Sequence, residues 1–319
     1  MTESVLVVGA TGHIGRHFVH ALRNEGRDVL MLVRPHPPDD SAGRDRRAVI
    51  ESLFRLGARL LEGGLEDVRT LERACADADA IVSCVDHRPD NLKLQATLAK
   101  VAAKSGRVKR IIPSQFGMDS RVYAQGRVDH GDTKRELQQE FDDCGVPVTY
   151  VHINGLVTAW AASLGQLGLK QPPDEQIDVY GAGNIKFSMV TPEDVARHAS
   201  RALFDPRTAN RHTLISPPEN RLSQGELIVM WESLTGAKLH RHTISARALD
   251  ERIAAVSDKP DKFAALSFLQ LIRAAWIDGL GDGRRRPDVL ELTELYPDIG
   301  YETIRQYLSR FTSAANAAE

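Results

Sequence analysis

The stretch Val5-Leu-Val-Val-Gly9-Ala-Thr-Gly12-His-Ile-Gly15 decides the fold of this 319-residue chain. Its four apolar residues predict a buried strand, and its three glycines stand where that strand would turn into a helix. In such a unit the first glycine permits a tight turn, the second lets backbone approach a pyrophosphate, and the third allows close helix packing. The helix, predicted from Ile14 to Glu25, would point the positive end of its dipole at the phosphates. The stretch therefore predicts a dinucleotide site.

The remainder of the N-terminal half alternates short apolar runs with longer amphipathic ones. Such alternation predicts a parallel sheet with helices on both faces. Together with the glycine pattern, it indicates an α/β fold with a Rossmann-type doubly wound parallel sheet. The predicted strands are Val5–Val8, Val29–Val33, Ala58–Leu61, Ala80–Cys84, Arg110–Pro113 and Val148–Ile153.

The sequence is less regular beyond residue 155, where we expect a smaller α+β substrate domain. The predicted domains are 1–155 for the nucleotide and 156–319 mainly for the substrate, with 185–216 returning to the first domain. Thr191-Pro192 predicts the start of a helix, with threonine as the N-cap and proline at the first helical position. Further strands are predicted at 177–181 and 186–189, and further helices at 223–235, 246–256 and 260–277.

Composition narrows the class of protein. A net charge of -2 indicates neither a nucleic-acid partner nor a charged membrane surface. No apolar run approaches the roughly 20 residues that cross a bilayer, and Met1-Thr-Glu-Ser has no basic segment of a secretory signal. Cys75, Cys84 and Cys144 are few and widely spaced, as is typical of reduced thiols. We expect a cytoplasmic enzyme or binding protein.

The end of the second predicted strand indicates which dinucleotide binds. An NAD site commonly has Asp or Glu there for the ribose 2′-hydroxyl, but this chain has Arg34 after Leu30–Val33. Because a guanidinium suits a 2′-phosphate, we expect NADPH rather than NADH. Arg44, Arg46 and Arg47 follow in the next segment, where they either bind the same phosphate or only contact solvent.

Two other strand ends should border the nicotinamide, because ligands of open α/β sheets lie beyond the carboxyl ends of the strands. One strand end carries Ser83, and the other continues into Pro113-Ser-Gln-Phe-Gly117. Phe116 could cover the nicotinamide ring or pack in the core, and the sequence leaves both open. His87 is expected to be a surface residue.

Lys134 is the candidate for acid–base chemistry. Leu137, Phe141 and Cys144 recur at helical spacing, and Lys134 extends this apolar face by one turn toward the carboxyl edge of the sheet. A lysine desolvated there would have a lowered pKa and could act as a general acid or base. The alternative is a surface lysine at a helix start. No tyrosine precedes a lysine by four residues, so the Tyr–Lys pair of ordinary short-chain dehydrogenases is absent.

With these features, the sequence resembles the isoflavone reductase-like group of NmrA-related atypical short-chain dehydrogenases. That group includes pinoresinol–lariciresinol, phenylcoumaran benzylic ether and isoflavone reductases. The resemblance spans nearly the whole chain. It rests on the glycine motif, Leu32-Val-Arg34-Pro, Pro113-Ser-Gln-Phe-Gly117, Lys134 thirteen residues before Pro147, and Asn154-Gly-Leu.

The resemblance implies an NADPH-dependent reductase of a small aromatic or phenolic molecule. It is also compatible with a homodimer. In relatives the lysine is thought to deprotonate a phenol, so that a benzylic ether leaves and a quinone methide accepts the hydride; an enone would instead use the lysine at its enolate. The alternative is a nucleotide-sensing regulator like NmrA, although such sensors typically lack the lysine. The implied catalytic residue is Lys134, and the implied cofactor residues are Gly9, Thr11, Gly12, Ile14, Gly15, Arg34, Arg46, Lys134 and Asn154. Ser83 and Phe116 complete the predicted cofactor residues because of their places at the strand ends.

Several residues depart from the pattern of the group. Gln115 stands where relatives commonly have Glu, and Met118 where leucoanthocyanidin reductases have His. The segment after Asn154 also departs sharply, which leaves room for a substrate other than a plant lignan. His130 either hydrogen-bonds the substrate or is a solvated loop residue, and we favour the second reading. The predicted substrate contacts are Met118, Gly155, Leu156 and Trp160.

Overall fold

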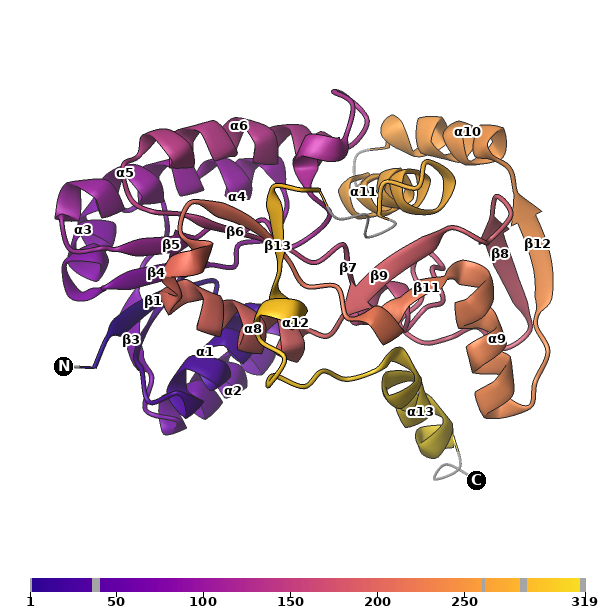
Figure 1. Ribbon diagram of the computed structural model, residues 1–319, viewed down its shortest axis with the longest axis horizontal. Coiled ribbons are helices and arrows are strands. Elements are labelled where there is room, and N and C mark those ends of the chain that lie inside the picture. The colour runs from indigo at the N-terminus through magenta and orange to yellow at the C-terminus, as the bar shows by residue number, and fades with distance from the viewer. Residues whose placement is uncertain (1, 36–40, 260–261, 282–285, 316–319) are drawn as a thin grey trace.

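The computed structural model describes residues 2–35, 41–259, 262–281 and 286–315 (Figure 1). Its central feature is a parallel sheet of five strands in the order β3-β2-β1-β4-β5. The predicted strands of this half are confirmed to within two residues. They are β1 (Ser4–Val8), β2 (Asp28–Val33), β3 (Arg59–Glu62), β4 (Ala80–Ser83) and β5 (Arg110–Ile112).

Three more parallel strands continue the sheet beyond β5. An isolated parallel bridge between Ile111 and Val148 joins β5 to the start of β6. Next to β6 lie β10 and then β13, two strands that are distant in sequence and were not predicted. Their bounds are β6 (Thr149–His152), β10 (Arg211–Leu214) and β13 (Val289–Glu291). The last strand, β13, thus comes from within the segment 156–319 that was assigned mainly to the substrate domain. The domain boundaries themselves stay a prediction.

Helices cover both faces because successive strand residues point to opposite sides. In β1, Val5 and Val7 belong to the core formed with α1, α2 and α8, whereas Leu6 and Val8 belong to the core formed with α3, α5 and α6. Figure 1 shows the first group below the sheet and the second above it. The helices are α1 (Gly15–Asn24), α2 (Ser41–Arg55), α3 (Val68–Asp77), α4 (Pro89–Lys93), α5 (Gln95–Ser105), α6 (Asp129–Asp143), α8 (Pro192–Phe204) and α12 (Leu292–Leu295).

The C-terminal half has its own core around Trp160, Phe187 and Trp276. Its small sheets are β11-β9-β7 and β12-β8. The predicted helix over 260–277 is α-helical from Phe263 to Ile272 and then π-helical from Arg273 to Ile277, while 260 and 261 lie outside the described residues. The remaining elements are β7 (Gly155–Leu156), α7 (Val157–Trp160), β8 (Gln176–Tyr180), β9 (Lys186–Val190), β11 (Arg221–Ser223), α9 (Gln224–Thr235), β12 (His240–Ile244), α10 (Ala246–Ser257), α11 (Phe263–Ile272) and α13 (Ile304–Ala315).

The two halves are joined by several passages of the chain and by buried polar contacts. The Thr191 side chain caps α8 as predicted, by accepting from Asp194 N. The side chain of Asp194 in turn accepts from the backbone N of Glu302 at 2.9 Å. Asn220 binds the same C-terminal segment, because its amide donates to Glu302 O and accepts from Ile304 N. The segment after β13 is thereby held against both halves.

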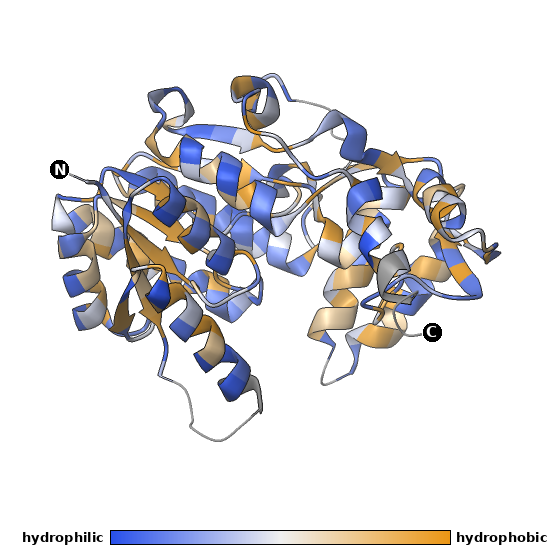
Figure 2. Cartoon of the chain, turned by 90° about the horizontal axis from the view of Figure 1, so that it is seen from below, coloured by the Kyte–Doolittle hydropathy of each residue, from blue (hydrophilic) through white to orange (hydrophobic). Residues whose placement is uncertain are grey.

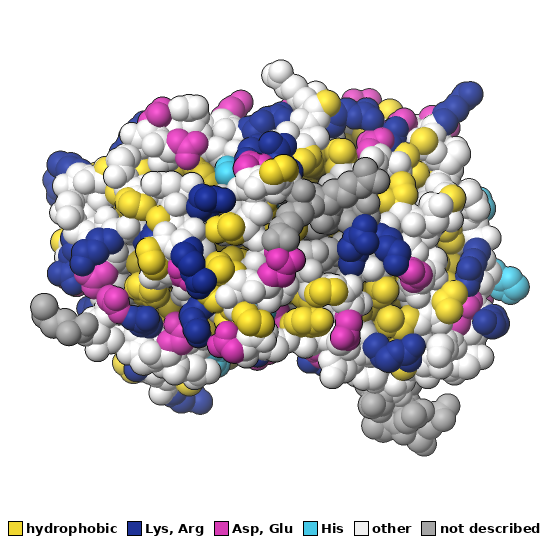
Figure 3. Space-filling model, viewed as in Figure 1, with side chains coloured by type: hydrophobic (Ala, Val, Ile, Leu, Met, Phe, Trp, Pro, Cys, Tyr) yellow, Lys and Arg dark blue, Asp and Glu magenta, His cyan; other side chains and the backbone are white. Residues whose placement is uncertain are grey.

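The distribution of hydrophobic and charged side chains and the state of the cysteines match the expectations from the composition. Hydrophobic residues concentrate on the strands and on the helix faces that meet them (Figure 2), while basic and acidic side chains are interspersed on the face shown in Figure 3. Cys75, Cys84 and Cys144 are all free thiols, as predicted. Among the described residues, no helix combines the length and the hydropathy needed to cross a membrane.

Candidate functional site

The glycine loop has the geometry predicted for a phosphate site. Gly9 has φ +74°, and a Cβ there would overlap the carbonyl oxygen of Cys84. A Cβ on Gly15 would overlap the carbonyl oxygen of Gly9, so the start of α1 packs directly on the loop. Thr11 and Ile14 are half-buried between these glycines, and no side chain caps α1. The loop backbone and the positive helix end are therefore available to an anion at the carboxyl edge of the sheet.

Two arginines mark the expected position of a 2′-phosphate. Arg34 is exposed directly after β2, and Arg46 is half-buried on α2. Burial and the neighbouring charge of Arg34 lower the pKa of Arg46, and its Nε is buried without a hydrogen-bond partner. Within the described residues, neither guanidinium forms an ion pair. Two adjacent cations with an unsatisfied donor fit a bound phosphate.

The other predicted cofactor residues lie at neighbouring strand ends. Ser83 is fully buried at the end of β4, and its Oγ has no partner. Phe116 is half-buried and packs on Phe18 with ring centroids 5.6 Å apart, which confirms a core contact; its cover of the nicotinamide stays a prediction. Asn154 has φ +53°, and its Nδ2 is likewise buried without a partner. The carboxyl edge thus collects several unsatisfied polar atoms, as expected where a polar ligand binds.

Lys134 lies in the interior, so the surface-lysine alternative is wrong. It is 5% exposed in α6, and Leu137 and Phe141 on the same helix face are also buried. A Cβ on Gly117 would lie 3.6 Å from Lys134 Nζ, which places the amine over the loop that follows β5. Burial lowers the pKa of Lys134 to about 8. No ion pair to a carboxylate is found for it in the part of the chain that the structure describes.

Gln115 contacts the lysine-bearing helix at the backbone of Lys134 itself. Its Nε2 donates to the backbone carbonyl of Lys134 at 3.2 Å, and its side chain is buried. An ionised carboxylate at this position could not donate this bond. Gln115 is therefore a positioning residue, a role that the sequence comparison with Glu did not predict.

The prediction that His130 is a solvated loop residue is wrong. It lies in the first turn of α6 and is 6% exposed. Its Nδ1 lies 3.3 Å from Ser267 Oγ of α11, while burial and the charge of Lys134 lower its pKa to about 2. His87 is exposed, as predicted, and its ring lies 5.0 Å from those of His130 and Phe263. The available signal for His130 was its spacing, since residues four apart share a helix face.

The predicted substrate contacts lie mainly in the C-terminal core. Met118 and Trp160 are 3% and 4% exposed, and the ring centroids of Trp160 and Phe187 are 4.2 Å apart. Gly155 is buried, and a Cβ there would overlap the Phe187 ring. Leu156 is half-buried against the core below the sheet. Direct contact of these four residues with substrate stays a prediction.

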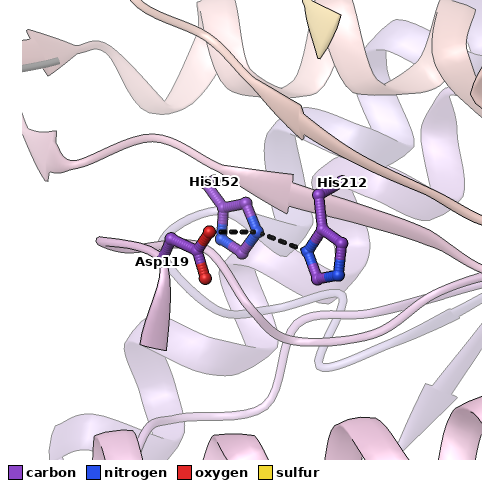
Figure 4. A group of neighbouring side chains, drawn as sticks. All are labelled: Asp119, His152 and His212. Atoms are coloured by element: carbon purple, nitrogen blue, oxygen red, sulfur yellow. Dashed lines mark hydrogen bonds and ion pairs between the residues drawn. The ribbon is translucent and has the colours of Figure 1, made fainter. Parts of the chain in front are cut away.

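Asp119, His152 and His212 form a cluster whose possible metal-ligand atoms all lie within 4.8 Å of one another (Figure 4). His152 Nε2 lies 3.0 Å from His212 Nδ1, with ring planes 5° apart and centroids 5.3 Å apart. The two nitrogens therefore point straight at each other, as in an N–H···N hydrogen bond, instead of converging on a third point. Asp119 pairs with Arg121 Nε at 2.9 Å. The group is a hydrogen-bonded histidine pair beside an ion pair.

The comparisons with known proteins agree with this arrangement. The model described as the NmrA-like family matches residues 1–308. The chain belongs to the NmrA-like family. Within this family, pinoresinol reductase 1 of Arabidopsis thaliana is 33% identical over 314 residues, which cover 96% of each chain. An isoflavone reductase homolog of Lupinus albus is 30% identical and covers 96% of this chain and 98% of its own.

Solved structures show the same fold over nearly the whole of this NmrA-like chain. A crystal structure of isoflavone reductase superposes with a TM-score of 0.89 at 28% identity, covering 98% of this chain and 100% of that one. A structure of AtPrR2 with NADP+ and (+)pinoresinol has a TM-score of 0.87 at 31% identity, covering 98% and 99%. These neighbours confirm the Rossmann-type fold class.

Proposed function

We propose that the protein is an NADPH-dependent reductase of a small aromatic or phenolic compound. The observation that carries the proposal is the buried Lys134 amine, which has no carboxylate partner among the described residues and lies over Gly117 at the carboxyl edge of the sheet. Similar proteins of this family are named pinoresinol reductases and an isoflavone reductase homolog, which supports an enzyme. One of the similar structures contains NADP+.

The residues present fit NADPH. The Gly9–Gly15 loop packs directly on Cys84 and on the start of α1, since a Cβ at either end would overlap backbone atoms. A glycine loop of this kind lets backbone amides approach a pyrophosphate. Arg34 and Arg46 would hold the 2′-phosphate, where the buried Nε of Arg46 lacks a partner. Asn154 and Ser83 would meet the nicotinamide side with their own unsatisfied atoms. NADPH bound here would supply the hydride.

Lys134 would supply the proton chemistry. A pKa near 8 leaves an appreciable neutral fraction at neutral pH, so that Nζ can accept a proton from a phenol bound beside it. The phenolate then releases electrons into its ring, which expels a benzylic ether oxygen and forms a quinone methide on the substrate. With an enone substrate, the Lys134 ammonium would instead stabilise the developing enolate. Both roles need the same position of Nζ.

The alternative is a regulatory protein that senses NADP without turnover. Such a protein has no use for a buried amine at the edge of its nucleotide site, and an unpaired buried charge destabilises the fold. The burial of Lys134 therefore favours an enzyme.

The test compares wild type with Lys134→Ala, and with Lys104→Ala as a control at an exposed lysine on α5. NADPH consumption is followed with phenolic benzylic ethers, isoflavonoids and cyclic enones, while tryptophan fluorescence follows NADPH binding. We expect Lys134→Ala to bind NADPH normally and to lose at least about 100-fold in kcat/KM. This is the loss in rate typical of removing a general acid or base. Binding without turnover by wild type on every substrate class would support the sensor instead, and equal turnover by the two Lys134 forms would remove Lys134 from the mechanism.

A further inference from the structure

The first turn of α6 carries a second buried polar group that the proposed function does not use. His130 lies four residues before Lys134, so both side chains project from the same helix face, one turn apart. The two groups are close enough for the charge of Lys134 to depress the pKa of His130. The imidazole is therefore a neighbour of the Lys134 amine.

Helix α11 fixes the orientation of the imidazole. Ser267 Oγ lies 3.3 Å from His130 Nδ1, and Ser267 itself is buried. One helical turn later, Gln270 holds the start of α6 in two ways, since Oε1 accepts from Asp129 N at 3.2 Å and Nε2 donates to Asp129 Oδ1 at 2.9 Å. Because the two nitrogens lie on different sides of an imidazole ring, the contact of Nδ1 with Ser267 leaves Nε2 for another partner. Nε2 has no hydrogen-bond partner within the described residues.

The state of the ring limits what it can do. Burial and Lys134 both disfavour the imidazolium, so the neutral ring is the favoured form of His130. A neutral imidazole is a poor proton source, but it is a good hydrogen-bond partner in a site from which water is excluded. A role as a second general acid is therefore disfavoured, and a role in recognition is favoured.

We propose that His130 Nε2 forms a hydrogen bond with a second oxygen of the substrate, near the phenol oxygen that Lys134 deprotonates. The inference rests on the proposed function, which places the phenol at Lys134. Because the two side chains project from adjacent turns of one face, the ligand would be a phenol that carries a second oxygen on the side that faces α6. A hydroxyl suits either tautomer of His130, since it can both donate and accept. A ring without the second oxygen would displace water from Nε2 without replacing its hydrogen bond.

The experiment measures binding to the NADP+-loaded protein with two probes that differ by one hydroxyl, 4-propylcatechol and 4-propylphenol. Titration calorimetry should give wild type a roughly tenfold preference for the catechol, as expected for one buried hydrogen bond. His130→Leu should abolish the preference, whereas His130→Gln, which keeps a polar group, should restore part of it. Ser267→Ala leaves the imidazole in place without its anchor and should reduce the preference.

Equal affinity of wild type for the two probes, or no binding of either, would overturn the inference. So would a preference that survives in His130→Leu. The turnover assay is read separately: a catechol preference without NADPH consumption keeps the role of His130 and removes the reductase, whereas turnover without a preference does the opposite. If His130→Leu does not fold, Ser267→Ala and His130→Gln still decide, because a preference unchanged in both contradicts the assigned contact.

Discussion

At the scale of single residues, Lys134 is held in a costly state. Its lowered pKa of about 8 means that the ammonium form lowers the free energy of unfolding by roughly 3 kcal/mol relative to an ordinary lysine. Because the folded protein disfavours the ammonium, this destabilisation is fully present below about pH 8 and fades as the pH rises toward the unfolded value of about 10.4. The fold tolerates this cost at a position beside its nucleotide loop, which is where a basic amine is useful.

The same pKa predicts the pH dependence of the reaction. If Lys134 acts as a base, its neutral form must be present, so kcat/KM should rise about tenfold per pH unit below pH 8 and level off above it. Gln115→Glu adds a carboxylate at the start of α6, which stabilises the ammonium and should move the midpoint to higher pH. Steady-state rates between pH 6 and 10 measure both effects.

The control for this shift is Gln139→Glu, the same change at an exposed position of α6. It should leave the midpoint unchanged. A profile for wild type that stays flat through pH 8 would contradict the role of Lys134 as a base.

The sequence predicted Lys134 but not the state of His130, and the reason lies in the range of their contacts. The burial of Lys134 follows from a local pattern, because Leu137 and Phe141 continue its helix face. His130 is buried by Ser267 of α11, far away in the sequence. The four-residue spacing from Lys134 indicates a shared helix face, but it does not reveal the cover that α11 provides.

At the scale of elements, the loop before α1 packs so closely that neither Gly9 nor Gly15 has room for a Cβ. Gly15→Ala would place a methyl group against the Gly9 carbonyl, so the helix start must move away from the loop. We expect NADPH affinity to fall at least tenfold and the free energy of unfolding to fall by about 1–3 kcal/mol, as for overpacked cores. Fluorescence titration and urea denaturation measure the two quantities.

Gly300→Ala is the matched control, since nothing lies within contact distance of a Cβ at that position. It should change neither quantity. Unaltered NADPH affinity in Gly15→Ala would mean that the helix start does not contribute to the nucleotide site.

The strands differ in how far the sequence could predict them. β1 and β2 are continuous apolar runs because both faces of the sheet are covered. β13 has only three residues, Val289–Glu291, and its glutamate binds Ser216 N through Oε1. Val289 and Leu290 are its only apolar residues, which is too short an apolar run to indicate a strand, so its place in the sheet depends on long-range pairing.

At the scale of the whole molecule, the C-terminal segment ties the halves together through Asn220. This side chain is fully buried and satisfies the backbone of Glu302 and Ile304. Asn220→Ala leaves both backbone groups unpaired, so the free energy of unfolding should fall by roughly 2–4 kcal/mol. Urea denaturation followed by circular dichroism and by tryptophan fluorescence measures the loss.

The two signals should still coincide in Asn220→Ala, because both halves share the sheet and its C-terminal strand. Asn24→Ala, at an exposed residue of α1, should be nearly neutral. A loss in Asn220→Ala no greater than in this control would show that the segment contributes little.

The late strand β13 also has a consequence for synthesis of the protein. On the ribosome, β1 to β6 emerge early, but β10 and then β13 complete the sheet only after residue 291 has been made. Until then the nascent chain exposes an unpaired strand edge, which is a template for wrong pairing between chains. Productive folding therefore has to wait for nearly all of the sequence described here, and chaperones that shield strand edges should matter most during that interval.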